Sequence, residues 1–238
     1  MSTSLQPIPI VNLAISFIPA LVALIILIKW SLEAKNACYA IVRMLVQLLL
    51  IGYVLTYIFE SDSATIILAV LCIMVVASSW IALGTVKQHR APLFICAFSA
   101  ILLGGGMTLW LVSQGVLDLQ PWYMPQYLIP LAGMIFANSM TSISLAAERI
   151  YAEMSRGVDY PEARNIAMQA AMIPVINALF AVGLVSLPGM MTGQILSGVS
   201  PLVASRYQIM VMCMIFGSAG ISAACFLSWG RTVFETKR

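Results

Sequence analysis

The stretch ERIYAEMSRGVDYPEAR, residues 148–164, decides how this chain is arranged. The whole chain is 61% hydrophobic and only 9% charged, yet seven charged residues fall within these positions. Long apolar segments flank the stretch on both sides, and a charge at the centre of a bilayer costs several kcal/mol. We therefore expect the stretch to lie outside the hydrocarbon, as a loop between two membrane helices that carries a small helix along the membrane surface.

The composition is that of a polytopic membrane protein. The mean hydropathy is +0.99 over 238 residues, far above that of soluble domains. We expect an all-α membrane bundle of about seven transmembrane helices, forming one transmembrane domain over residues 1–238. The apolar runs predict spans at residues 10–28, 37–59, 64–83, 92–112, 127–147, 170–187 and 203–229. Pro19 predicts a kink in the first of them.

The distribution of basic residues predicts the orientation. The stretch 148–164 contains three arginines, so the positive-inside rule places it in the cytoplasm. With the N-terminus outside, most other basic residues also fall in the cytoplasm: Lys29, Lys35, Lys87, Arg90, Arg231, Lys237 and Arg238. The outside then holds three acidic residues and one basic residue: Glu60, Asp62, Asp118 and Arg206. We therefore predict an N-out, C-in topology.

The motifs of soluble enzymes and of nucleotide-binding proteins are missing from the sequence. Three glycines at 104–106 lie inside a predicted span with no lysine after them, so we expect them to allow close helix approach or a bend rather than to hold phosphate. His89, the one histidine, is expected to be solvated in a basic loop. The five cysteines form no CxxC pair and are expected to be small buried apolar residues. An intramembrane enzyme and a nucleic-acid partner are both disfavoured.

Polar residues at membrane depth are the candidates for a transport path. Arg43 and Gln47 are four residues apart and share one helix face. Either Arg43 reaches the headgroups while Gln47 bonds a neighbouring helix, or both line a path. Asn138, Thr141 and Ser142 share another face, where they serve either helix packing or the path.

The segment 187–201 is predicted to be a helix-breaking outer segment. It contains four helix breakers: Pro188, Gly189, Gly193 and Gly198. It is nevertheless too apolar for an aqueous loop, so we expect a short helix dipping into the outer face, either as a cap or in contact with cargo. Met190 and Met191 carry soft sulfur atoms that suit soft metals better than hard ones.

At this point three strings of the sequence resemble a known family. They are LVSLPGMMTGQILSGVSP at 184–201 followed by RYQI at 206–209, GMIFANSM at 133–140, and the Arg43–Gln47 spacing. They are similar to the membrane subunit of the Fet-type bacterial ABC transporters, which are linked to iron export, and to the plant STAR-type aluminium-tolerance subunit. The resemblance covers nearly the whole chain.

The resemblance implies a permease half-transporter in the bacterial inner membrane, surrounded by lipid. A separate cytoplasmic ATPase would hold ATP and Mg²⁺, and two copies of each subunit would assemble, with no cofactor in this chain. The ATPase would dock on a cytoplasmic coupling loop at 148–166, which is similar to the EAA-type coupling segment. The implied docking residues are Gly157, Asp159, Tyr160, Pro161, Glu162 and Ala163. We expect the Tyr160 ring to be the apolar anchor of that contact.

The sequence leaves the cargo open. The proposed path residues are Arg43, Gln47, Asn138, Ser142, Met190, Met191 and Gln194, and no metal ligand is assigned. One alternative is an ABC exporter of a nucleotide sugar or another small solute. A second is a stand-alone secondary transporter or channel, which is disfavoured because every acidic residue maps to a loop or a span end.

Overall fold

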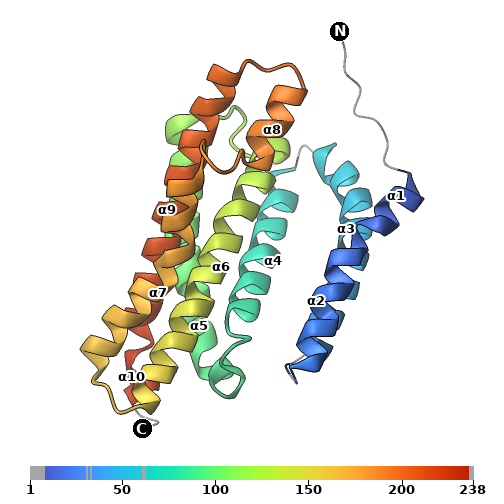
Figure 1. The fold of residues 1–238 in the computed structure, drawn as a ribbon. Coiled ribbons are helices and arrows are strands. Elements are labelled where there is room, and N and C mark those ends of the chain that lie inside the picture. The colour runs from blue at the N-terminus through green and yellow to red at the C-terminus, as the bar shows by residue number, and fades with distance from the viewer. Residues whose placement is uncertain (1–8, 31, 33, 61–62, 236–238) are drawn as a thin grey trace. The chain divides into compact units, whose positions relative to one another are not determined.

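The computed structural model describes residues 9–30, 32, 34–60 and 63–235. Asp62, Lys237 and Arg238, which contribute to the predicted orientation, lie outside these residues. The chain divides into two compact units, residues 1–61 and residues 62–238. The described part of each is built from helices (Figure 1), which confirms the expected all-α fold class.

The first unit contains a helical hairpin. Its elements are α1 (Ile10–Ile15), α2 (Phe17–Lys29) and α3 (Ala34–Phe59). The helix is interrupted at Ser16, whose hydroxyl donates a hydrogen bond to the Leu13 carbonyl at 2.6 Å. Pro19 explains the interruption, because it has no N–H to give to the carbonyl four residues earlier, that of Ile15.

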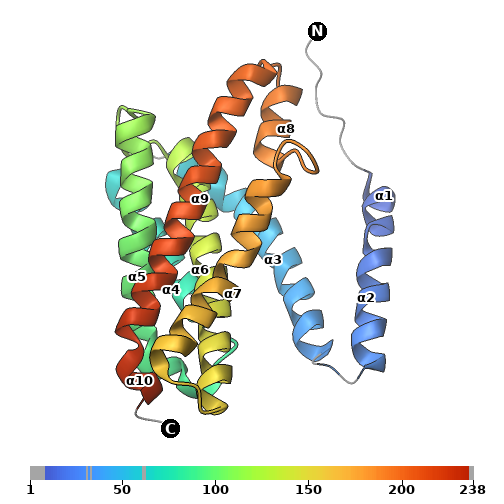
Figure 2. The same ribbon diagram turned by 60° about the vertical axis from the view of Figure 1, so that its left-hand side comes forward.

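The second unit is a bundle whose helices pack mainly on α6 and α9. Its elements are α4 (Ala64–Ala82), a 3₁₀ turn η1 (Lys87–His89), α5 (Arg90–Trp110), a π-helical turn η2 (Leu111–Val116), α6 (Pro125–Ser155), α7 (Tyr160–Ala181), α8 (Gly189–Leu196), α9 (Pro201–Trp229) and α10 (Arg231–Glu235). Helix α6 contacts α4, α5, α7 and α9, and Figure 2 shows α9 lying between α5 and α7.

Small residues allow α5, α6 and α9 to pack closely. A Cβ atom on Gly104 would lie 2.5 Å from the Ser222 hydroxyl oxygen of α9. The Ser222 hydroxyl in turn donates a hydrogen bond to the Ser139 hydroxyl oxygen of α6 at 3.1 Å, and both serines are fully buried. A Cβ atom on Gly105 would lie 2.9 Å from the Phe136 ring. The predicted role in close helix approach is therefore confirmed for Gly104 and Gly105.

Six of the described helical segments are long and apolar enough to cross a membrane. They correspond to every predicted span except that at 170–187. The helix in that region, α7, begins at Tyr160 rather than at residue 170, and its first turns carry Glu162 and Arg164, which lower its hydropathy. Its 22 residues give a length of about 33 Å at 1.5 Å per residue, enough for a 30 Å hydrocarbon core. A seventh span at α7 and the N-out orientation therefore stay predictions.

Candidate functional site

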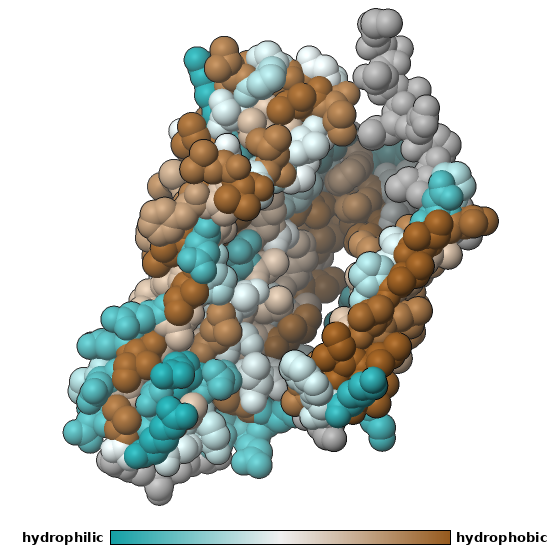
Figure 3. Space-filling view, viewed as in Figure 1, coloured by the Kyte–Doolittle hydropathy of each residue, from teal (hydrophilic) through white to brown (hydrophobic). Residues whose placement is uncertain are grey.

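The polar stretch 148–164 forms the tip of a helical hairpin. Helix α6 continues to Ser155 and α7 begins at Tyr160, so only residues 156–159 connect them. The expected separate surface helix is therefore wrong. Helix α6 is 31 residues, or about 46 Å, long and so exceeds the thickness of the hydrocarbon core. Figure 3 shows polar side chains gathered around this end of the second unit.

A buried carboxylate lets α6 remain helical through this polar sequence. Glu153 is only 5% exposed, and its Oε1 atom lies 2.7 Å from Arg149 Nη2 and 3.3 Å from Arg156 Nη1. The two arginines stand one turn before and one turn after it, the spacing at which helical side chains meet. Two cations thus compensate one buried anion near the tip of the hairpin.

The six predicted docking residues divide into an exposed and a buried set. Four are exposed: Gly157, Asp159, Pro161 and Glu162. Tyr160 and Ala163 are buried, at 6% and 0% exposure. The Tyr160 ring, expected to anchor that contact, is therefore largely covered within this chain, and the surface most available to a partner is the polar side of the hairpin.

Tyr160 instead attaches the hairpin to the end of α9. Its hydroxyl donates a hydrogen bond to the backbone carbonyl of Leu227, and the Arg231 guanidinium carbon lies 5.4 Å from its ring centroid. Burial raises the pKa of Tyr160, while the positive charges of Arg164 and Arg231 partly oppose the shift. The phenol therefore stays protonated, and remains a donor, throughout the physiological pH range.

His89 also packs on α6, against expectation. It is 9% exposed, and its ring centroid lies 5.1 Å from that of Tyr151. The prediction of a solvated histidine is wrong because the turn between α4 and α5 packs against α6. The contact lies at the end of α6 that is predicted to be cytoplasmic. A lone histidine in a basic segment does not reveal such packing.

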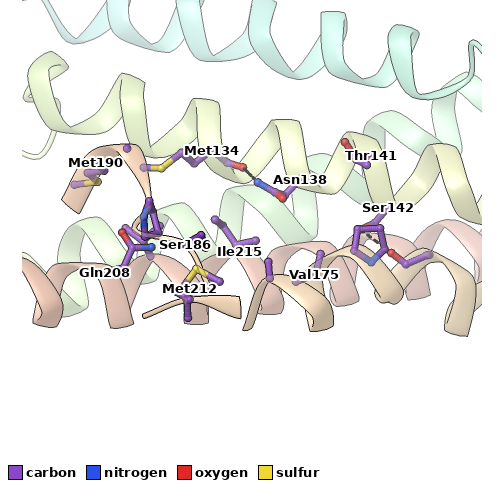
Figure 4. A pocket seen from close by; sticks show the side chains of 17 residues that line it. Met134, Asn138, Thr141, Ser142, Val175, Ser186, Met190, Gln208, Met212 and Ile215 are labelled. Carbon is purple, nitrogen blue, oxygen red and sulfur yellow. Dashed lines mark hydrogen bonds between the residues drawn. The ribbon is translucent and has the colours of Figure 1, made fainter. Parts of the chain in front are cut away.

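Helices α6, α7, α8 and α9, together with the α7–α8 connection, line a cavity of about 320 Å³ (Figure 4). Three predicted path residues line it: Asn138, Ser142 and Met190. The Asn138 amide donates to the Met134 carbonyl at 2.8 Å, and the Ser142 hydroxyl donates to the Ala171 carbonyl of α7 at 3.4 Å. The structure thus brings residues from separate predicted segments to one place.

The other predicted path residues are not among those that line this cavity. Met191 and Gln194 are on α8, where the Gln194 Oε1 atom is buried without a hydrogen-bond partner. Arg43 and Gln47 lie one turn apart on α3 of the first unit, and both are exposed.

Among the donor side chains of the cavity, sequence reasoning missed two thioethers and one amide: Met134, Met212 and Gln208. Gln208 is 5% exposed, and its Oε1 atom has no hydrogen-bond partner. Two pairs, Met134 with Asn138 and Gln208 with Met212, have the four-residue spacing that places side chains on one helix face. Each of the two apolar helices has an amide side chain one turn away from a methionine. This pattern in the sequence could have identified the missed residues.

The wall formed by α8 has the expected short helix. Pro188 precedes its first residue, and the chain takes positive φ angles at Gly183 (+82°) and Gly198 (+92°), which glycine adopts readily. The prediction that Gly193 also breaks the helix is wrong, because Gly193 lies within α8. One glycine inside a helix costs only about 1 kcal/mol, and α8 packs on α9.

The cavity presents neutral polar groups and sulfur atoms. No lysine, arginine, histidine or acidic residue is among the described residues that line it. Nor do the described parts of the chain contain a group of three or more His, Cys, Asp or Glu residues able to hold a metal ion. The donors available are the amides of Asn138 and Gln208, three hydroxyls and three thioethers.

Comparison with known proteins identifies relatives along most of the chain. The profile of the uncharacterised protein family UPF0014 matches residues 10–234. The "Probable iron export permease protein FetB" of Escherichia coli (strain K12) is 34% identical over 92% of this chain and 90% of its own length. "Protein ALUMINUM SENSITIVE 3" of Arabidopsis thaliana is 32% identical over 84% and 77%. The "UPF0014 membrane protein STAR2" of Oryza sativa subsp. japonica is 35% identical over 80% and 72%. No solved structure matches.

Proposed function

This chain belongs to the UPF0014 family of membrane proteins, and from that premise we propose that it is the membrane-spanning subunit of an ATP-driven exporter of iron or another metal ion. We place it in the bacterial inner membrane. The E. coli relative, named a probable iron export permease, supports the cargo class. The structural observation that supports transport is the connection between the cavity and the hairpin.

The same two helices form both features. Along α6, Asn138 and Ser142 line the cavity and Glu153 lies in the hairpin tip. Along α7, Tyr160 lies at the tip and Ala171 lines the cavity. A force applied to the hairpin would therefore displace two walls of the cavity, since packed helices move as rigid elements.

The partner in this proposal is a cytoplasmic ATPase that carries ATP and Mg²⁺. It would dock on the exposed hairpin residues Gly157, Asp159, Pro161 and Glu162, while Tyr160 and Ala163 hold the hairpin in place. Two permeases and two ATPases would form the complete transporter. The resemblance of the hairpin sequence to the coupling segment of ABC permeases supports this arrangement.

The lining of the cavity bears on the alternatives. A nucleotide sugar carries phosphate charges, which proteins bind with arginine, lysine or clustered backbone N–H groups, and the described lining contains no cationic side chain. A proton-coupled secondary transporter carries an ionisable group in its path. The buried Glu153 is instead paired with two arginines at the hairpin. Both observations favour the ATP-driven export of a metal ion.

The remaining path residues stay part of the proposal. The unpaired Oε1 of Gln194, one turn from Met190 on α8, supports a path that continues along α8 past Met191. Arg43 and Gln47 share a face of α3 and are proposed to line the path there.

Purification of the tagged protein from its native membrane tests the partnership. We expect a soluble subunit to co-purify in equal amount and to hydrolyse ATP. Glu162→Lys should abolish this ATPase activity in the purified complex, because Glu162 is exposed at the tip. Glu60→Lys, an exposed carboxylate on the first unit, is the matched control and should keep it. An ATPase activity that is equal in both variants would contradict docking on the hairpin.

Transport is measured in inside-out membrane vesicles that contain both subunits. We expect ATP-dependent uptake of metal, and Asn138→Leu should reduce it because the amide lines the cavity. Asn177→Leu is the control, since Asn177 is exposed on α7 and does not line the cavity. Equal uptake in the two variants would show that the path lies elsewhere.

A further inference from the structure

The cavity has a polar end and a sulfur-rich end. Figure 4 shows Asn138, Thr141 and Ser142 toward one end, and the second group of side chains toward the other. That second group contains Ser186 and, with it, three thioethers and one amide: Met134, Met190, Met212 and Gln208. We call these four residues the thioether cluster. They come from α6, α8 and α9, so the cluster exists only in the folded bundle.

Gln208 supplies an independent sign of a ligand. Its side chain is 95% buried, since it is 5% exposed, and it lines the cavity with its Oε1 atom lacking a hydrogen-bond partner. A buried amide carbonyl without a partner is unfavourable, because it has given up its hydrogen bonds to water and gained none in return. A cation in the cavity would satisfy this oxygen, because an amide carbonyl is a metal ligand that carries no charge.

The chemistry of the donors indicates which cation fits. Thioether sulfur is a soft ligand and selects soft ions such as Cu(I), whereas ferrous sites use histidine and carboxylate. All four donors are neutral. The electrostatic cost of moving an ion from water into a low-dielectric site rises with the square of its charge, so a neutral donor set favours a monovalent ion over a divalent one.

We propose that the thioether cluster is a binding site for a soft monovalent metal ion of the Cu(I) class. This inference rests on the proposed export function and specifies its cargo. The sulfur atoms of Met134, Met190 and Met212 would bind the ion, and the Gln208 carbonyl oxygen would complete its ligands. Asn138 and Ser142, at the other end of the cavity, would receive the ion as it leaves the cluster.

Binding is tested on the purified permease in detergent, without its ATPase. Thiols also bind Cu(I), so the parent protein carries alanine at Cys38, Cys72, Cys96, Cys213 and Cys225. Cu(I) affinity is measured by competition with a chromophoric chelator, and Fe(II) affinity is measured in parallel. We expect one Cu(I) per chain, held more tightly than Fe(II), and sulfur neighbours in the X-ray absorption spectrum of the bound copper.

The decisive variant replaces all three methionines of the cluster with leucine, which keeps the volume and removes the sulfur. The Cu(I) affinity should fall at least about tenfold for each sulfur lost. The matched control replaces Met107, Met210 and Met214, which do not line the cavity, and should bind as the parent does. If the triple variant does not fold, the Cu(I) affinities of the single variants Met190→Leu and Gln208→Leu are measured instead, and each should be lower than that of the parent.

The outcomes separate the two proposals. Unchanged Cu(I) affinity in the cluster variants, or tighter binding of Fe(II) than of Cu(I) by the parent, would overturn the thioether site whatever the transport assay shows. Normal Cu(I) binding without ATP-dependent transport would leave the site standing and overturn the export function. If the cluster variants leave ATP-dependent transport unchanged, only the assignment of the cargo would be overturned.

Discussion

The hydroxyl of Tyr160, the first residue of α7, donates a hydrogen bond to the backbone carbonyl of Leu227, in the last turn of α9. Carbonyls in the last turn of a helix have no partner within that helix, so the tyrosine supplies one from a distant part of the sequence. This bond joins the hairpin tip to a helix that also lines the cavity.

Loss of that hydroxyl should loosen the hairpin. Tyr160→Phe removes a buried donor and leaves the Leu227 carbonyl unpaired, which should lower the free energy of unfolding by about 1–3 kcal/mol. Denaturant titration of the detergent-solubilised protein measures the change. Tyr57→Phe, at a side chain that is 75% exposed, is the control and should have no effect. Equal stability of the two variants would contradict the role of the bond.

The same bond predicts a dependence on alkaline pH. Because burial raises the pKa of Tyr160, its stabilising contribution is fully present below the unfolded-state pKa of about 10 and is lost as the pH rises through the higher folded-state pKa. The stability difference between the wild type and Tyr160→Phe should therefore be constant from about pH 7 to pH 9 and shrink only above about pH 10. A difference that disappears near neutral pH would show that the phenol is not the donor.

The stability cost of replacing a glycine of α5 with alanine should depend strongly on its position. A Cβ on Gly104 would approach the Ser222 backbone nitrogen to 2.8 Å, a contact that a side-chain rotation cannot relieve. Gly104→Ala should therefore destabilise the bundle by about 1–3 kcal/mol. Gly106→Ala meets only the Leu102 side chain, at 3.9 Å, and should be tolerated. Thermal unfolding of both variants checks the contrast, and similar melting temperatures would contradict the close packing.

The turn of the hairpin should be sensitive to its glycine. Gly157 has a φ of +87°, so Gly157→Ala places a side chain in a strained backbone conformation that costs about 1–2 kcal/mol. We expect a distorted tip and a lower ATPase activity of the complete complex. Gly193→Ala, at a helical glycine of α8 with open space around it, should leave that activity unchanged. Full ATPase activity with Gly157→Ala would show that docking of the partner does not depend on the conformation of this turn.

Whether α7 crosses the membrane is decided by labelling its two ends. On the cysteine-free background, Asp159→Cys should react with an impermeant maleimide only from the cytoplasmic side. Ser197→Cys, in the segment that follows α8, should react only from the outside. Reaction of both cysteines from the same side would mean that α7 does not cross, and the count would be six spans rather than seven.

The sequence by itself determined the fold class, because helices are the form in which a long apolar segment can satisfy its backbone hydrogen bonds within a bilayer. The apolar runs also located α2 to α6 and α9, and the glycine-rich string located α8. These features depend on local composition, which can be read directly from the amino-acid sequence. The same reasoning placed Asn138, Ser142 and Met190 among the functional candidates without showing that they meet.

Only the tertiary structure decided which side chains face one another. It buried Tyr160 and His89, which the sequence placed in exposed segments, because α9 and α6 supply surfaces that no local pattern specifies. It also brought Gln208 and Met212 of α9 to Met134 of α6, more than seventy positions away in the sequence. Periodicity shows which residues share a helix face, but the partner of that face is set by how the helices pack.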